Sequence, residues 1–271
     1  MSSTILVTGG TGLLGAQVVP LLRQAGHKIR VLSRHDREPG DGVEYVAVDL
    51  MTGDGLDEAL GGVRTVLHLA GGPKGDDVAT RKLVQAAQRA GTVEHLVLIS
   101  VIGADTVPIG YFARKAEAER IVAASGIPYT ILRAAQFHDL ALKTVRAMAK
   151  APILPAPGGI RWQPVASREV AARLAELTLG NPAGRVPDLA GPRIYTLEEL
   201  QHSYLAAVGK HRMRLPIHVP GKVGKAYRSG ANLTLGAPTG SDTWEQFLTA
   251  QTTGARGATQ SSRIQPDKPG L

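Results

Sequence analysis

Tyr111 and Lys115 are the residues of this chain whose types and spacing most clearly suggest catalysis. They stand four residues apart at the start of an expected helix, so they share one helix face. A tyrosine hydroxyl can protonate a carbonyl oxygen as hydride arrives, and a nearby ammonium lowers the phenol pKa from about 10. Ser100, at the end of the preceding strand, would hold the carbonyl oxygen. These residues predict carbonyl reduction, although the Tyr-Lys spacing also arises by chance and Ser100 also fits a structural role.

A glycine-rich stretch follows the first expected strand directly and opens a helix. Its spacing is Gly9-x-x-Gly12-x-x-Gly15, in which Gly9 would allow a tight turn, Gly12 a close approach to a pyrophosphate and Gly15 close helix packing. A helix N-terminus presents unpaired N–H groups and a favourable dipole to that anion. The predicted contacts in this stretch are Thr8, Gly9, Thr11, Gly12, Leu13, Leu14 and Gly15.

The end of the second strand decides between the two dinucleotides. An acidic residue there would bind the ribose of NAD and repel a 2′-phosphate, whereas this chain has Ser33 and Arg34. A guanidinium can pair with a phosphate in bidentate fashion, so NADP(H) is the predicted cofactor. The alternative is that Arg34 is a solvated surface residue. Further expected cofactor contacts are Asp49, Leu50, Leu69, Ala70, Gly71 and Lys115, while His68 fits a strand position better than a ligand.

The elements that position these residues alternate between strands and helices. We expect apolar, β-branched strands at Ile5–Thr8, Ile29–Ser33, Tyr45–Val48, Thr65–Leu69, Leu96–Ser100 and Thr130–Arg133. We expect amphipathic helices at Leu14–Gln24, Ala79–Ala90, Phe112–Ala124, Leu140–Ala149 and Arg168–Leu179, the last capped by Ser167. Another begins at Thr196, which forms a capping-box pattern with Glu199. This order predicts an α/β, Rossmann-type, doubly wound parallel sheet.

The chain divides into three predicted parts. Residues 1–155 form the NADP(H)-binding domain, and residues 156–250 form a smaller mixed substrate-binding lobe that partly completes the sheet. Residues 251–271 are polar, rich in Gly, Ser and Thr, and without periodicity, so we expect a disordered tail.

Composition excludes several classes of protein. The 271 residues contain no cysteine, which rules out disulfides and thiolate metal sites, and no residue cluster predicts another metal site. The net charge is +8, but aromatic residues are only 4% and none is interleaved with a basic cluster, so we expect no nucleic-acid partner. No apolar run is long enough to span a bilayer and no signal peptide is recognisable, so we expect a cytoplasmic protein without a membrane partner. The sequence leaves open whether the protein forms a homodimer.

The glycine stretch, His68-Leu69-Ala70 and the string from Tyr129 to Arg133 resemble the short-chain dehydrogenase/reductase superfamily, in its atypical NmrA-like NAD(P)H-binding branch. The resemblance covers roughly Thr4 to Phe247. It implies that Ser100, Tyr111 and Lys115 are the catalytic set. The branch often lacks a working tyrosine, and some of its members bind the nucleotide only to sense redox state, whereas Tyr111 and Lys115 are both present here.

The segment after the sixth strand should face the substrate, because a Rossmann sheet presents its strand ends to ligand. The candidate substrate contacts are Gln136, Phe137, His138 and Trp162. His138 also fits an acid/base role, and Trp162 also fits a core position. The predicted function is NADPH-dependent reduction of a ketone or quinone-like small molecule. Two alternatives remain, a non-catalytic NADP(H)-sensing regulator and an NAD(P)-dependent epimerase or isomerase.

Overall fold

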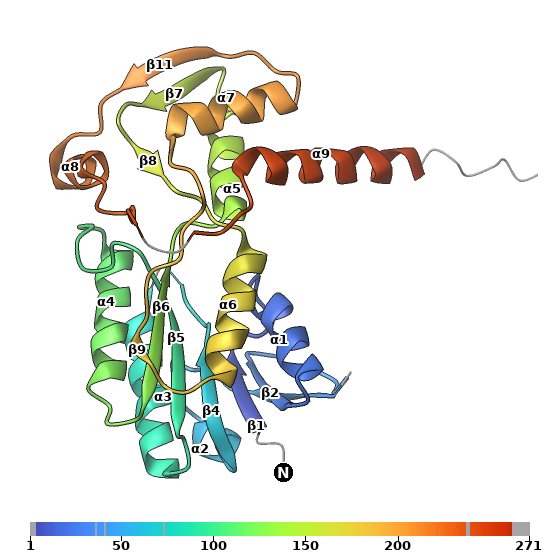
Figure 1. Cartoon of the computed structure of the whole chain (residues 1–271), viewed down its shortest axis with the longest axis vertical. Coiled ribbons are helices and arrows are strands. Elements are labelled where there is room, and N and C mark those ends of the chain that lie inside the picture. The colour runs from blue at the N-terminus through green and yellow to red at the C-terminus, as the bar shows by residue number, and fades with distance from the viewer. Residues whose placement is uncertain (1–3, 36, 41, 73, 237–238, 262–271) are drawn as a thin grey trace, which may run out of the picture.

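A seven-stranded parallel sheet forms the centre of the computed structural model (Figure 1). The structure describes residues 4–35, 37–40, 42–72, 74–236 and 239–261, with side chains through residue 252. The strand order of the sheet is 3-2-1-4-5-6-9. The strands, in that order, are β3 (Val43–Ala47), β2 (Lys28–Ser33), β1 (Thr4–Thr8), β4 (Val63–His68), β5 (His95–Val101), β6 (Tyr129–Ala134) and β9 (Gly184–Arg185). The predicted Rossmann-type doubly wound fold is confirmed.

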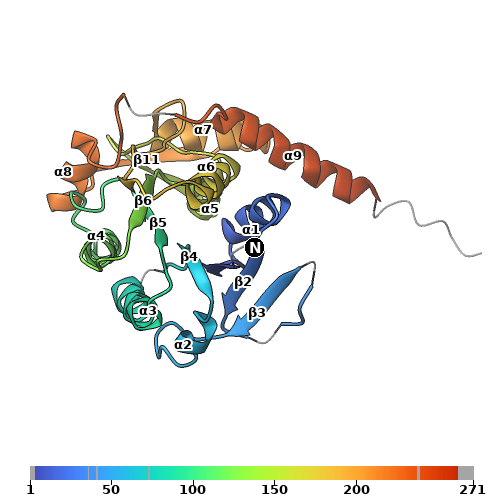
Figure 2. The same cartoon turned by 60° about the horizontal axis from the view of Figure 1, so that its bottom comes forward.

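Helices cover both faces of this sheet (Figure 2). One face packs against α1 (Gly15–Gln24) and α6 (Ser167–Leu179). The other packs against α2 (Leu56–Ala59), α3 (Asp76–Ala90) and α4 (Gly110–Ala123). Each face has its own apolar core, because β-branched and leucine side chains project alternately to the two sides of every central strand. Two buried layers hold the strand ends rigid where the glycine loop begins.

A smaller lobe follows the sixth strand and lies beyond the carboxyl ends of the strands (Figure 1). It contains α5 (His138–Met148), β7 (Ile153–Pro157), β8 (Arg161–Trp162), β10 (Tyr195–Thr196), α7 (Leu197–Ala207), β11 (Met213–Ile217), α8 (Gly221–Ser229) and α9 (Trp244–Ser261). The core of the lobe surrounds the fully buried Trp244 and includes residues of α5. By contrast, α6 packs on the main sheet and β9 is one of its strands. The proposed division into residues 1–155 and 156–250 remains a prediction.

The ends of three helices test the sequence analysis. The capping box at Thr196 is confirmed, since the Thr196 hydroxyl accepts from the Glu199 N–H and the Glu199 carboxylate accepts from the Thr196 N–H. Ser167 is not an N-cap: Ala166 holds that position, and the Ser167 hydroxyl instead contacts Gln17 at 3.0 Å and Asp139 at 3.3 Å. The expected tail begins inside α9, which continues to Ser261, and residues 262–271 lie outside the described part of the chain.

Within those described ranges, the structure has no helix that combines the length and apolar composition needed to cross a membrane.

Candidate functional site

The glycine loop joins β1 to α1 in a shape that only glycine permits. Gly9 has a φ of +67°, and a Cβ on it would stand 2.6 Å from the backbone N of Ala70. A Cβ on Gly15 would overlap the backbone of Gly10, so the start of α1 packs directly on the loop. The loop keeps its shape through the Gly12 N–H, which donates to the Gly9 carbonyl at 3.0 Å. The tight turn and the close packing expected of this motif are both present.

The start of α1 fits an anion. The N–H groups of Leu13 and Leu14 have no hydrogen-bond partner among the described residues, and both residues line the adjoining pocket. The first turn of α1 carries no acidic residue. Unpaired N–H groups and the positive end of the helix dipole would together hold a pyrophosphate here.

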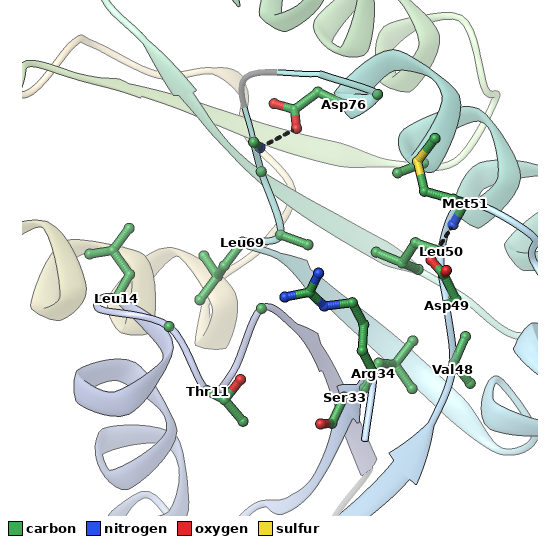
Figure 3. Close-up of a pocket in the computed structure, with 18 of the residues that line it drawn as sticks. Thr11, Leu14, Ser33, Arg34, Val48, Asp49, Leu50, Met51, Leu69 and Asp76 are labelled. Atoms are coloured by element: carbon green, nitrogen blue, oxygen red, sulfur yellow. Dashed lines mark hydrogen bonds between the residues drawn. The ribbon is translucent and has the colours of Figure 1, made fainter. Parts of the chain in front are cut away.

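The pocket itself has a volume of about 520 Å³ and lies at the carboxyl ends of β1, β2 and β4, where the strand order reverses (Figure 3). Ligands of doubly wound sheets bind at this switch point. Most of the predicted cofactor contacts line it, namely Gly9, Thr11, Gly12, Leu13, Leu14, Ser33, Arg34, Asp49, Leu50, Leu69, Ala70 and Gly71. Thr8, Gly15 and Lys115 lie behind this wall and support it. A pocket with both polar and apolar lining, placed over a glycine loop, fits a dinucleotide.

Arg34 extends from the end of β2 into the pocket, between the glycine loop and the segment that contains Asp49 (Figure 3). It is exposed, and it makes no hydrogen bond or ion pair with any described residue. The neighbouring Ser33 is buried, and its hydroxyl accepts from the His35 N–H at 3.3 Å. An exposed guanidinium at this position is available to a phosphate group of the cofactor.

Asp49 shapes the opposite wall of the pocket. Its Oδ1 accepts from the Met51 N–H at 2.9 Å, which fixes the loop that carries Leu50 and Met51 past the pocket. One carboxylate oxygen is thus committed to the loop, and Asp49 is also one of the expected cofactor contacts. That contact remains a prediction.

A chain of hydrogen bonds behind the pocket ties the glycine loop to α3. The Ala70 N–H donates to the Thr8 hydroxyl at 3.1 Å, and the Thr8 hydroxyl lies 2.6 Å from Nδ1 of His68. Nε2 of His68 lies 3.0 Å from the Thr80 hydroxyl, which donates to the Asp76 carbonyl at 2.7 Å. Because Thr80 uses its proton on that carbonyl, the bond pattern assigns the His68 proton to Nε2. His68 is therefore a buried structural link, as its strand position suggested.

The protonation of His68 follows from its surroundings. Burial, with a contribution from the positive charge of Lys115, lowers the pKa of His68 to about 3. A neutral imidazole can donate at one nitrogen and accept at the other, as the chain of bonds requires. This neutral imidazole links β1, β4 and α3.

Lys115 forms a buried ion pair that the sequence analysis did not anticipate. Its Nζ lies 2.9 Å from Oδ2 of Asp76 and 3.4 Å from the Ile99 carbonyl. Asp76 Oδ1 accepts from the Gly72 N–H at 2.6 Å, so the carboxylate also fixes the loop after β4. A Cβ on Gly71 would stand 2.9 Å from Lys115 Nζ, which places the ammonium directly behind the pocket wall.

Tyr111 lies one turn before Lys115 on α4, and its pKa responds to the charge of Asp76. Burial and the negative charge of Asp76 raise the pKa of Tyr111 to about 12. The expectation that Lys115 lowers this pKa is wrong for the structure as it stands, because the carboxylate of Asp76 already compensates the ammonium. Tyr111 is consequently a proton donor that stays protonated at neutral pH.

Ser100 lies on the same side of the sheet as α4. Side chains alternate along β5, with Ile99 in the core that contacts α1 and α6 and Leu98 in the core that contacts α3 and α4, so Ser100 faces the α4 side. Its hydroxyl is buried and has no hydrogen-bond partner among the described residues. Ser100, Tyr111 and Lys115 thus share one flank of the sheet, and their catalytic roles remain a prediction.

The predicted substrate contacts separate into two groups. Phe137 lines the dinucleotide pocket, and the adjacent Gln136 is buried beside it. His138 instead is fully buried in the lobe, where its ring lies 5.1 Å from that of Phe247 and 6.1 Å from that of Trp244. Burial lowers the pKa of His138. Trp162 packs half-buried against the same core.

Several pocket residues were missed by the sequence analysis. They are Leu32, Val48, Met51, Lys74, Gly75, Asp76 and Ala79. A signal existed for Asp76, because it is an acidic residue in the first turn of the helix after the fourth strand, where it meets the helix dipole. No local pattern marks the others, which reach the pocket through the path of the loops.

Comparison with known proteins agrees with this geometry. A (4-alkanoyl-5-oxo-2,5-dihydrofuran-3-yl)methyl phosphate reductase of Streptomyces griseus subsp. griseus is 34% identical over 204 residues, which cover 72% of this chain and 70% of the relative. Quinone oxidoreductase 2 of Escherichia coli strain K12 is 27% identical over 214 residues, 76% of this chain and 75% of the relative. The solved NADPH complex of an NADPH-dependent quinone oxidoreductase from Escherichia coli superimposes with a TM-score of 0.76 at 23% identity, covering 91% and 99% of the two chains.

The family model described as NAD(P)H-binding matches residues 9–177, a span that begins in the glycine loop and includes both the pocket and the Asp76–Lys115 ion pair. This match and the superposition confirm the resemblance to the short-chain dehydrogenase/reductase superfamily. The chain belongs to the NAD(P)H-binding family.

Proposed function

We propose that this protein is an NADPH-dependent reductase of carbonyl compounds, either ketones or quinone-like molecules. The observation that carries the proposal is the buried ion pair of Lys115 and Asp76 directly behind the Gly71 wall of the dinucleotide pocket, with Tyr111 one turn before Lys115 on α4 and within reach of the Asp76 charge. The names of the two curated relatives, one a reductase of a phosphorylated oxo-dihydrofuran and one a quinone oxidoreductase, support the same class of reaction.

The preference for NADPH over NADH rests on Arg34. At the end of β2 it makes no hydrogen bond or ion pair with the residues that the structure describes, and it points into the pocket where a ribose 2′-phosphate would lie. Charge-assisted hydrogen bonds to a phosphate would favour the phosphorylated dinucleotide.

The chemistry divides between the dinucleotide and the chain. When bound, the reduced nicotinamide supplies two electrons as hydride to the carbonyl carbon. The electron pair of the C=O bond moves to oxygen, and the Tyr111 hydroxyl gives that oxygen its proton. A phenol whose pKa is about 12 can protonate an alkoxide, which is far more basic, and water then restores the phenol proton. Ser100 would orient the carbonyl oxygen, while Lys115 stays paired with Asp76 behind the pocket wall.

One observation favours a second function, that of a non-catalytic NADP(H) sensor. Lys115 is already paired with Asp76, and the pKa of Tyr111 lies above its ordinary value rather than below it. A protein that only binds the nucleotide would need no activated tyrosine.

Anaerobic oxidation of NADPH against a panel of ketones, aldehydes, quinones and enones distinguishes the two functions. The reductase proposal expects consumption of NADPH in equal amount to the reduced product for at least one compound class. NADPH binding, seen by nicotinamide fluorescence, with no turnover on any compound would favour the sensor.

A further inference from the structure

The outer face of the small sheet in the lobe is entirely apolar. The strands β7 and β11 pair in parallel, with Met213 opposite Ile153 and Ile217 opposite Pro157, so alternate residues of both strands share one face. We call this surface the β7–β11 face; it consists of Ile153, Pro155, Pro157, Met213, Leu215 and Ile217.

This face is open to solvent. The exposed fraction is 73% for Met213, 55% for Leu215 and 47% for Ile153. The opposite side of the same two strands is covered, because Leu154 is fully buried and Arg214 donates to Glu198 of α7 at 2.6 Å. Figure 1 shows β11 at the outer end of the molecule, beyond α7 and far from the seven-stranded sheet. The face is therefore displayed away from the dinucleotide site.

Positive charge is concentrated in the same part of the chain. The whole chain has a net charge of +8, and residues 200–241 contain six basic residues but no Asp or Glu. The six are Lys210, Arg212, Arg214, Lys222, Lys225 and Arg228. Lys210 and Arg212 precede β11, and Lys222 and Lys225 follow it on α8; all four are exposed. Lys150, also exposed, precedes β7. Basic residues thus flank both ends of the apolar face along the chain.

We propose that the β7–β11 face docks on an anionic phospholipid surface, with Met213, Leu215 and Ile153 entering the interface and the flanking lysines contacting lipid phosphates. An exposed apolar surface bordered by cations is the pattern of peripheral membrane contact, where hydrophobic burial and attraction to acidic lipids add together. The expectation of no membrane partner considered only spanning segments, which such a contact does not need.

Two other occupants fit the surface less well. A second copy of the chain would bring two basic segments together, and Pro216 in β11 removes a backbone donor that an added strand would need. A nucleic acid would be met by aliphatic side chains, whereas stacking on bases requires aromatic ones.

Co-sedimentation with vesicles tests the proposal. The full chain is mixed with vesicles of phosphatidylcholine alone or of phosphatidylcholine with phosphatidylglycerol, and bound protein is measured at low and high salt. We expect binding only to the anionic vesicles, weakened by salt. The double substitution of Met213→Asp and Leu215→Asp should reduce the affinity about ten-fold or more, since it exchanges apolar contacts for repelled charges.

The matched control is Leu179→Asp, which removes another exposed leucine (42%) at the end of α6 in the main domain and should bind vesicles like the native chain. Unchanged NADPH binding in both variants shows that the dinucleotide domain is folded, and the test is independent of the proposed reductase activity. The proposal is overturned if the native chain ignores anionic vesicles or if the double variant binds them equally well. It is also overturned if the double variant instead dissociates a dimer in sedimentation velocity, or loses affinity for a single-stranded oligoribonucleotide, while vesicle binding is unchanged.

Discussion

Lys115 and Asp76 form an ion pair with 2.9 Å between Nζ and Oδ2, and each side chain is only 6% exposed. The pair connects α4 to the first turn of α3 directly behind the pocket, so it joins the catalytic candidates to the dinucleotide site. It also contributes to the state of Tyr111, because burial and, after it, the negative charge of Asp76 raise the pKa of that phenol. An arrangement of this kind keeps the tyrosine in its proton-donating form.

Replacing Asp76 tests this relationship. In Asp76→Asn the negative charge is lost while the shape is kept, so the pKa of Tyr111 should fall below about 12. The buried Lys115 also loses its counter-charge, which should lower the free energy of unfolding by about 3–5 kcal/mol. Phenol ionisation followed by ultraviolet absorbance, with Tyr111→Phe as the blank that identifies the signal, measures the first effect. Denaturant unfolding measures the second.

The control for this substitution is Asp77→Asn, which changes the adjacent and less buried carboxylate of the same helix turn. It should leave both the Tyr111 titration and the unfolding midpoint close to their native values. An equal response of the two variants would mean that the charge of the helix terminus, rather than the ion pair, controls the phenol.

Cofactor preference depends on Arg34. The Arg34→Ala variant should bind NADPH about 10- to 100-fold more weakly and NADH with nearly native affinity, because only NADPH has the phosphate that the guanidinium contacts. Titration of nicotinamide fluorescence with each dinucleotide gives the two dissociation constants. Arg37→Ala is the matched control, since Arg37 lies over the Tyr45 ring, with its Cζ 6.0 Å from the ring centroid, and should not alter the ratio. If the ratio of the NADPH and NADH dissociation constants were the same in Arg34→Ala as in the native protein, Arg34 would not be the residue that selects NADPH.

Stability should fall in mild acid because of His68. Its pKa is lowered from 6.5 to about 3 in the folded protein, so between these values only the unfolded chain takes up the proton. The free energy of unfolding then decreases as the pH is lowered below 6.5, by up to about 1.4 kcal/mol per pH unit. Denaturant melts between neutral pH and pH of about 5 measure this slope. His68→Gln should show a shallower slope, whereas the exposed substitution His211→Gln should keep the native one.

Burial also lowers the pKa values of His95 and His138, which adds to the same slope and leaves part of it in the His68 variant. A native protein with no pH dependence in this range would contradict the neutral, hydrogen-bonded state of His68.

The sequence predicted the fold well where the signal was local. Six strands of the main sheet were predicted from their mostly apolar, β-branched runs, and the structure places strands at all six positions. The seventh strand, β9, consists only of Gly184–Arg185, and it exists because it pairs with β6 rather than because of any pattern of its own. The same holds for the two-residue strands β8 and β10 in the lobe.

The site shows the same division. The glycine spacing and Arg34 could be interpreted from their neighbours in sequence, but the role of Asp76 depends on its distance to Lys115 in a different helix. His138 was predicted to contact substrate from its position after β6, and its packing against the rings of Trp244 and Phe247 of α9 was not foreseen; the substrate contact remains a prediction. Contacts between distant segments decided each of these outcomes, and no local motif encodes them.

The most direct test of the central claim is single-turnover oxidation of bound NADPH by a carbonyl or quinone acceptor, compared between the native protein and Tyr111→Phe. Tyr204→Phe, a tyrosine of the lobe core, serves as the matched control. We predict that the native protein and the control transfer hydride to the acceptor, and that Tyr111→Phe binds NADPH normally but reacts about 100-fold or more slowly, the range for loss of a general acid. Equal rates in all three proteins would contradict the assignment of Tyr111 as the proton donor beside the dinucleotide pocket.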